Sequence, residues 1–309
     1  MTGITNPVRQ TGDRVPERLV PFQAGPLEAH AAAADRSMSL EAGPPSVPSA
    51  DLTLARPPQN LFAEVSGAPF TKLNPKLAGR LVSMPATPPG AVEQYRKLAA
   101  TLHLSHIERE LRVIMVTSAL PGDGKTLTAA NLALTLSESY HRRVLLIDAD
   151  LRRPAMYDIF QLPNIAGLSD WLKASSQRKV PVVHVSEHLT LLPAGHPDPN
   201  PISSLTSDRM ARLLKDAAAT FDWVIVDTPP IGVLTDANLM GDMVDGALLV
   251  IRAKVTPFAM IERAMQALGR DRLLGVVMNG TDEGLSQQGY EAYYGYGPGP
   301  RNSKSLTGR

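Results

Sequence analysis

Residues 112–131 read R-V-I-M-V-T-S-A-L-P-G-D-G-K-T-L-T-A-A-N, and this stretch is the strongest indication of the fold. Its apolar run up to Ser118 predicts a buried strand, and the pattern from Thr126 to Ser139 predicts a helix. The intervening loop, Ala119–Thr126, carries two glycines followed by Lys-Thr. A strand, a glycine-rich loop and a helix in this order are the setting that a phosphate-binding loop requires.

The loop matches the Walker A pattern at all but one position, since Ala119 stands where the first glycine is usual. In such a loop the backbone N–H groups and the helix N-terminus cradle phosphates, Lys125 reaches the β- and γ-phosphates, and the Thr126 hydroxyl can ligate Mg²⁺. We therefore expect ATP and Mg²⁺ to bind. The predicted nucleotide-binding residues are Pro121, Gly122, Asp123, Gly124, Lys125, Thr126 and Leu127.

Acidic residues follow two other apolar runs. Asp227 ends the run Trp223–Asp227, and two prolines then prevent the strand from continuing. Asp148 and Asp150 follow the run that begins at Val144, and residues two apart on an extended chain point to the same side. Beside a nucleotide, one carboxylate of such a pair can hold metal while the other accepts a proton from an attacking hydroxyl.

Six apolar runs in total predict strands, and helical patterns fall between most of them. Runs that are apolar throughout are typical of a parallel sheet covered on both faces, so we predict an α/β fold with a doubly wound, mostly parallel sheet of the P-loop NTPase (Min/Par-like) type. The strands are expected at 112–118, 144–148, 189–192, 223–227, 247–251 and 275–279, and helices at 91–103, 126–139 and 207–220.

The two ends of the chain differ from this core. Fourteen of the 27 prolines precede residue 90, and so proline-rich a segment buries too little apolar surface to offset its ordering entropy. We therefore predict three parts: a disordered segment at 1–82, a P-loop domain at 83–282 and a flexible tail at 283–309. Four of the seven tyrosines lie in that tail, at Tyr290, Tyr293, Tyr294 and Tyr296.

Composition excludes several classes of protein. The absence of cysteine excludes a cysteine-ligated iron–sulfur cluster or zinc site, and a net charge of +1 gives no reason to expect nucleic acid as a partner. No apolar stretch approaches the roughly 18 residues that a membrane helix needs. We therefore expect any membrane association to come through a partner.

Several motifs in the correct order resemble the bacterial tyrosine kinases, P-loop enzymes that regulate capsule and exopolysaccharide export. The resemblance covers residues 89–282 and is strongest to the autokinases of exosortase-linked polysaccharide clusters. It rests on the loop Thr117–Thr126, the L-L-I-D-A-D-L-R-R-P block at 145–154, V-I-V-D-T-P-P at 224–230, L-P-A-G at 192–195, P-N-P at 199–201, Asp236-Ala237 and G-V-V-M-N at 275–279.

The resemblance implies a role for each site residue. Lys125 and Thr126 would hold phosphate and Mg²⁺, Asp150 and Asp227 would complete the metal site, and Asp148 would act as general base. Catalysis would then depend on Lys125, Asp148 and Asp150, and Asn279 would contact adenine. The tail tyrosines would accept phosphate, and about 30–45 Å of extended chain from residue 283 would let them reach a neighbouring subunit.

The family also implies partners and a location. A homo-oligomer, in related proteins a ring, is expected, although Ala99 replaces the second arginine of the family's Glu-x-x-Arg-x-x-Arg helix that begins here at Glu93 and Arg96. A separate membrane-embedded chain-length-determinant protein (a polysaccharide co-polymerase) would anchor and activate the kinase. The chain would then be cytoplasmic and peripheral to the inner membrane.

Two other functions remain open at this point. A Min/Par-type ATPase would use nucleotide as an assembly or positioning switch, but those proteins have an additional lysine where this chain has Leu120, and they lack a tyrosine tail. A non-enzymatic scaffold that uses ATP only to set its assembly state is the other alternative. The intact set of Lys125, Asp148, Asp150 and Asp227 argues against it.

Overall fold

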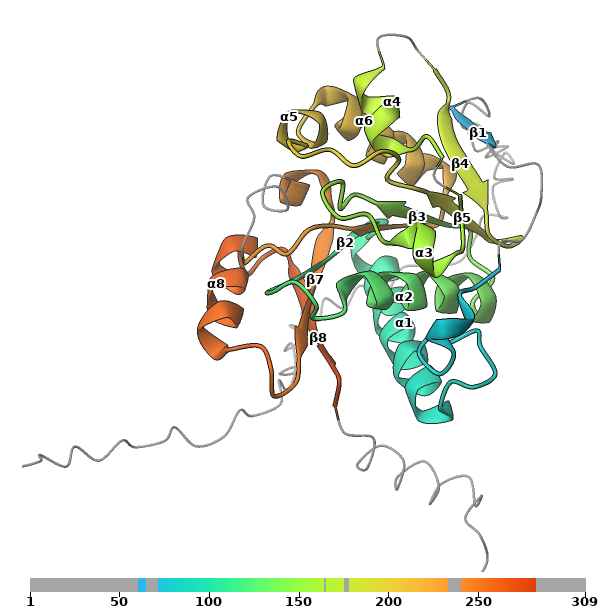
Figure 1. Cartoon of the computed structure of the whole chain (residues 1–309). Coiled ribbons are helices and arrows are strands. Elements are labelled where there is room, and N and C mark those ends of the chain that lie inside the picture. The colour runs from blue at the N-terminus through green and yellow to red at the C-terminus, as the bar shows by residue number, and fades with distance from the viewer. Residues whose placement is uncertain (1–60, 65–71, 164, 175–177, 233–239, 282–309) are drawn as a thin grey trace, which may run out of the picture. The chain divides into compact units, whose positions relative to one another are not determined.

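The computed structural model describes residues 61–64, 72–163, 165–174, 178–232 and 240–281. They form one sheet of eight strands with helices on both faces (Figure 1). The strand order is β1-β4-β5-β3-β6-β2-β7-β8. All strand pairs are parallel except β4 with β5. The predicted doubly wound, mostly parallel α/β fold is therefore confirmed.

The six predicted strands are all present. They are β2 (Val113–Ser118), β3 (Val144–Asp148), β5 (Leu189–Leu192), β6 (Trp223–Asp227), β7 (Gly246–Arg252) and β8 (Leu273–Asn279). Two strands were not predicted, namely β1 (Phe62–Glu64) and β4 (Val180–His184). A proline at position 181 disguises β4, because proline is unusual inside a strand.

The helices divide between the two faces of the sheet. One face is covered by α1 (Pro89–Arg109), α2 (Lys125–Ser139) and α3 (Met156–Ile159). The other is covered by α4 (Leu168–Lys173), α5 (Ile202–Leu205), α6 (Asp208–Thr220) and α8 (Phe258–Leu268). Two short 3₁₀ helices, η1 (Pro75–Leu77) and η2 (Gly241–Met243), complete the described elements.

Alternate residues of the central strands contribute to two separate cores. In β2, Val113 and Met115 pack into the core under α4, α6 and α8, whereas Ile114 and Val116 pack into the core under α1 and α2. Both sets are buried, which explains why these strands are apolar throughout. The 3.6-residue periodicity predicted for 91–103, 126–139 and 207–220 corresponds to α1, α2 and α6.

Part of the segment expected to be disordered is ordered. Phe62–Glu64 pairs with β4, and the Phe62 ring meets the Phe221 ring edge-on at 5.4 Å between centroids. Residues 72–82 run along α2 and α3, with Leu81 fully buried. A few apolar side chains are enough to dock this proline-rich segment because the sheet supplies the rest of the core. The remaining residues of 1–82 lie outside the described part of the chain.

Among the described residues, none of the helices has the length and apolar character needed to cross a lipid bilayer. The residues expected to form the Glu-x-x-Arg-x-x-Arg pattern lie on α1, where Arg96 pairs with Glu93 at 3.8 Å, and a role of this helix in assembly stays a prediction. Ala99 is fully buried on the face of α1 that packs on the domain. Ala99 therefore packs within its own chain.

Candidate active site

The predicted phosphate loop lies between β2 and α2, as its sequence indicates. Gly122 and Gly124 have φ angles of 87° and 100°, a conformation that favours glycine. Ala119, which replaces the usual first glycine, is fully buried, and its φ is not positive. The substitution is therefore accommodated without backbone strain.

Three carboxylates gather around the lysine of this loop. Lys125 Nζ lies 2.8 Å from Asp150 Oδ2 and 3.6 Å from Asp227 Oδ1, and it donates to Thr126 Oγ1 at 3.0 Å. Asp148 is paired in register with Asp227 across β3 and β6. The strand order β3-β6-β2 places the carboxyl ends of these strands next to the loop, the usual position of ligand sites in doubly wound sheets.

Burial changes the acid–base properties of these groups. It raises the pKa of Asp148 to about 7, helped by the charge of Asp227 and opposed by N–H groups of Met156 and Ala155. Burial also raises the pKa of Asp227 to about 6, although Lys125 opposes the shift. For Lys125 burial alone would lower the pKa, but Asp227 and Asp150 outweigh it and the pKa is raised. The lysine is therefore positively charged at neutral pH.

The site as described fits a phosphate-bound divalent cation. Both oxygens of Asp227 are buried, and neither makes a hydrogen bond within the described residues. One lysine faces three carboxylates, which leaves an excess of negative charge when all are ionised. No cluster of three or more His, Cys, Asp or Glu side chains forms a ready-made metal cage in the described part of the chain. Mg²⁺ in nucleotide enzymes needs only one or two carboxylates besides phosphates and water.

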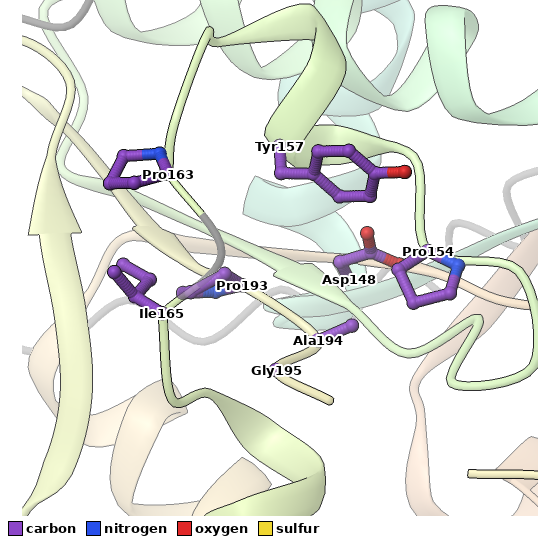
Figure 2. A pocket seen from close by; sticks show the side chains of 8 residues that line it. All are labelled: Asp148, Pro154, Tyr157, Pro163, Ile165, Pro193, Ala194 and Gly195. Atoms are coloured by element: carbon purple, nitrogen blue, oxygen red, sulfur yellow. The ribbon is translucent and has the colours of Figure 1, made fainter. Parts of the chain in front are cut away.

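Asp148 has a different environment from the other two carboxylates. Its Oδ2 accepts hydrogen bonds from Ala155 N at 3.2 Å and Met156 N at 3.1 Å, and its Oδ1 accepts one from Asp150 N at 3.2 Å. Figure 2 shows Asp148 in a pocket whose other walls come from α3, from the segments on either side of it and from the loop after β5. The pocket residues are Asp148, Pro154, Tyr157, Pro163, Ile165, Pro193, Ala194 and Gly195.

Several predicted loop residues have specific places in the structure. Pro121 and Gly122 are exposed, and Leu127 packs against the core under α2. The Asp123 side chain is buried, and it accepts hydrogen bonds from Leu120 N at 2.8 Å and Thr256 Oγ1 at 2.8 Å. It therefore braces the loop from within, and only its backbone is available to a phosphate.

Asn279 also lies against the phosphate loop. Its Nδ2 donates to Asp123 O at 3.0 Å, and a Cβ on Gly124 would come within 1.9 Å of that nitrogen. The structure thus brings Asn279 to the site, and its contact with adenine stays a prediction. The tail tyrosines Tyr290, Tyr293, Tyr294 and Tyr296 lie outside the described residues.

No local pattern in the sequence points to two residues of the site. Tyr157 lines the pocket beside Asp148 and has half of its side chain exposed. Thr256 reaches the phosphate loop from the turn after β7. Neither residue belongs to a local motif. By contrast, the L-P-A-G block at 192–195 is such a motif, and it supplies another wall of the pocket.

Comparisons with known proteins agree with this geometry. A family model described as an AAA domain matches residues 111–262. Tyrosine-protein kinase YwqD of Bacillus subtilis is 40% identical over 206 residues, which are 66% of this chain and 86% of YwqD. Tyrosine-protein kinase etk of Escherichia coli strain K12 is 35% identical over 194 residues, or 62% of this chain. That alignment spans only 27% of etk.

Solved structures give the same result. The kinase domain of Escherichia coli ETK superposes with a TM-score of 0.57 at 35% identity and covers 62% of this chain and 76% of that one. The chimerical protein CapA2B2 superposes with a TM-score of 0.59 at 27% identity and covers 68% and 91%. With these relatives and a phosphate loop surrounded by three carboxylates, the chain belongs to the bacterial tyrosine-protein kinase family.

Proposed function

We propose that this protein-tyrosine kinase is an autokinase that transfers the γ-phosphoryl group of Mg-ATP to the tyrosine cluster at 290–296 of another copy of the same chain. The observation that carries the proposal is the placement of Asp148. Its side chain is buried at the wall of a pocket, its pKa is raised to about 7, and Asp150 and Asp227 lie next to it. A carboxylate that can accept a proton beside the phosphate loop is the group that transfer to a tyrosine hydroxyl requires.

Each residue of the site has a distinct part in this proposal. The loop N–H groups from Gly122 to Thr126 and the charge of Lys125 would bind the phosphates of ATP. Thr126, Asp150 and Asp227 would hold Mg²⁺, which when bound neutralises charge on the β- and γ-phosphates. The buried oxygens of Asp227, which face Lys125 at 3.6 Å but make no close hydrogen bond within the described residues, support that assignment.

The transfer itself needs a proton acceptor near the phenol. A phenol has a pKa near 10, so at neutral pH its hydroxyl is protonated. Asp148 would take this proton as the phenolic oxygen bonds to the γ-phosphorus and the bond to the β,γ-bridging oxygen breaks. The products are phosphotyrosine and ADP, and the proton then leaves Asp148 for solvent.

The wider setting follows the family. We place the kinase domain at 83–282 and the acceptor tail at 283–309, and we infer that the chain forms a homo-oligomer in which tails reach neighbouring sites. A membrane-embedded chain-length-determinant protein would anchor it to the inner membrane from the cytoplasm, so that phosphorylation regulates polysaccharide polymerisation and export. The similarity to the chimerical CapA2B2 protein supports a two-protein arrangement.

Phosphotyrosine mapping by mass spectrometry tests the proposal. The purified protein and its Lys125→Met variant are each incubated with Mg-ATP, with and without the membrane partner. We expect phosphate on residues 290–296 of the wild type and none on the variant. If the wild type hydrolyses ATP but modifies no tyrosine even with the partner, the nucleotide-switch alternative replaces the kinase proposal.

A further inference from the structure

The segment immediately before α1, residues 72–88, is hereafter called the strap. It is held against the domain by a buried asparagine of α2. Asn131 Oδ1 accepts from Val82 N at 2.9 Å, and Asn131 Nδ2 donates to Arg80 O at 2.9 Å. Leu81 between them is fully buried in the core under α1 and α2. The strap is therefore fixed to the helix that begins at the phosphate loop (Figure 1).

The beginning of the strap contacts a second element, the end of α3. Asn74 is buried, its backbone N donates to Ile159 O at 2.9 Å, and its Nδ2 donates to Asp158 O at 3.1 Å. The same Nδ2 lies 3.4 Å from Asp158 Oδ1. The last carbonyls of any helix lack partners within the helix, and here Asn74 supplies them.

The other end of α3 contacts Asp148. Ala155, at the N-cap of α3, and Met156, its first residue, both donate their N–H groups to Asp148 Oδ2. Tyr157, between the two ends, forms a wall of the pocket in which Asp148 lies (Figure 2). One four-residue helix thus joins Asn74 to the carboxylate that would accept the proton.

A helix this short cannot hold its own position. One turn has almost no stability by itself, so contacts at its ends and on its buried face determine where it lies. Met156 and Ile159 anchor the buried face. At the end that lies away from Asp148, buried Ile159 and Phe160 hold the helix by packing, and Asn74 adds the hydrogen bonds that fix its last carbonyls.

We propose that Asn74 is a positioning residue for phosphoryl transfer: it holds α3 so that the N–H groups of Ala155 and Met156 and the ring of Tyr157 keep their places around Asp148. The inference rests on the proposed kinase function. Asn74 thereby acts on the site through α3, although it lies outside the region that matches the family motifs.

The most selective variant is Asn74→Asp. A carboxylate can still accept from Lys76 N, as Asn74 Oδ1 does at 3.0 Å, so the cap of η1 is kept. It cannot donate to Asp158 O, and it places negative charge against the Asp158 side chain. Thr87→Val is the matched control, because it removes a buried strap hydrogen bond, from Thr87 Oγ1 to Leu81 O, that does not involve α3.

Three measurements on the full-length protein test the inference. We expect Asn74→Asp to lower kcat for tyrosine phosphorylation about tenfold or more, since small displacements of a catalytic group have effects of this size, while the affinity of the nucleotide site changes less than about twofold. Amide exchange of the nucleotide-free protein should become faster in peptides covering 155–160. The double variant Asn74→Asp/Asp158→Asn, which reverses donor and acceptor, should recover part of both losses.

The controls separate positioning from stability. Thr87→Val should lower the midpoint of thermal unfolding but leave kcat and exchange at 155–160 unchanged. If Asn74→Asp does not fold, Asn74→Ser, which keeps a cap acceptor but has no amide donor, takes its place. Wild-type kcat in the Asn74 variant, or a loss of kcat without faster exchange in α3, overturns the inference. Absence of phosphotyrosine in the wild type would instead refute the proposed function, and the exchange measurement would still test the contact.

Discussion

At the scale of single residues, the site contains more negative charge than the fold alone would favour. Asp148 and Asp227 are buried with raised pKa values, and Asp227 has no hydrogen bond within the described residues. A buried carboxylate without full compensation lowers the stability of the folded state. Such a cost is expected where a protein keeps groups ready for a cation and a phosphate.

The Asp227→Asn variant should make the nucleotide-free protein more stable and the enzyme inactive. Removing the charge relieves a cost on the order of 1–3 kcal/mol at pH 8, which corresponds to an increase in melting temperature of roughly 2–6 °C in a domain of this size. Differential scanning calorimetry measures it. Asp222→Asn is the control, and its expected effect on stability has the opposite sign. The Asp222 carboxylate pairs with Arg143, which lowers its pKa, so neutralising it should slightly destabilise the protein. A lower melting temperature for Asp227→Asn would contradict the prediction.

Stability should also depend on pH in a defined window. The folded-state pKa values of Asp148 (about 7) and Asp227 (about 6) exceed the ordinary value of 3.8, so the folded protein holds protons that the unfolded chain has released. Their contribution is complete below pH 3.8 and is lost as pH rises through 6 to 7. Urea denaturation from pH 5.5 to 8 should show a smaller decline for Asp148→Asn than for the wild type. Equal slopes for the two proteins would show that Asp148 titrates normally.

At the scale of elements, the phosphate loop is braced by a turn and by a strand end that lie far away in sequence. Thr256, 133 residues after Asp123, donates to its carboxylate, and Asn279, 156 residues after it, donates to its backbone carbonyl. Thr256 Oγ1 also accepts from Arg252 N at 2.8 Å, so it connects the end of β7 to the loop. A loop held from several sides loses less entropy when it binds phosphate.

The Thr256→Val variant tests this bracing. Valine keeps the shape of the side chain but removes a hydrogen bond to a buried carboxylate, worth about 1–2 kcal/mol. We expect the Kd for ATP, measured by calorimetry, to rise about 3–10-fold, with a smaller change in kcat. Thr220→Val, which removes a threonine hydroxyl at the end of α6, is the matched control and should change neither quantity. An unchanged Kd in Thr256→Val would show that the loop needs no such brace.

The lengths and patterns of the elements explain which parts of the fold and of the site could be predicted from the sequence. β3 and β6 each carry a continuous apolar run that ends in an aspartate, so the strands and the positions of Asp148, Asp150 and Asp227 were predictable. The contact between Asn74 and Asp158 was not predictable, because the two residues are 84 residues apart and no local pattern joins them. α3 has only four residues and carries too little periodicity to stand out.

At the scale of the whole molecule, one edge of the sheet collects the chemistry. The carboxyl ends of β3, β6 and β2 lie side by side because the strand order places β6 between the other two. Helices on both faces bury the strands, and the strap and β1 add contacts that composition alone did not predict. The prolines before residue 90 do not tell which parts of that segment dock on the domain.

The most direct test of the kinase proposal uses two full-length variants that are each unable to form phosphotyrosine alone. One has Tyr290, Tyr293, Tyr294 and Tyr296 replaced by phenylalanine but keeps an intact site. The other, Lys125→Met, has an inactive site but keeps the tail. When the two are mixed with Mg-ATP and the membrane partner, mass spectrometry should find phosphate on the tail of the Lys125→Met chain. Continued ATP hydrolysis with no phosphotyrosine on that tail would contradict the proposal that this site phosphorylates a neighbouring copy.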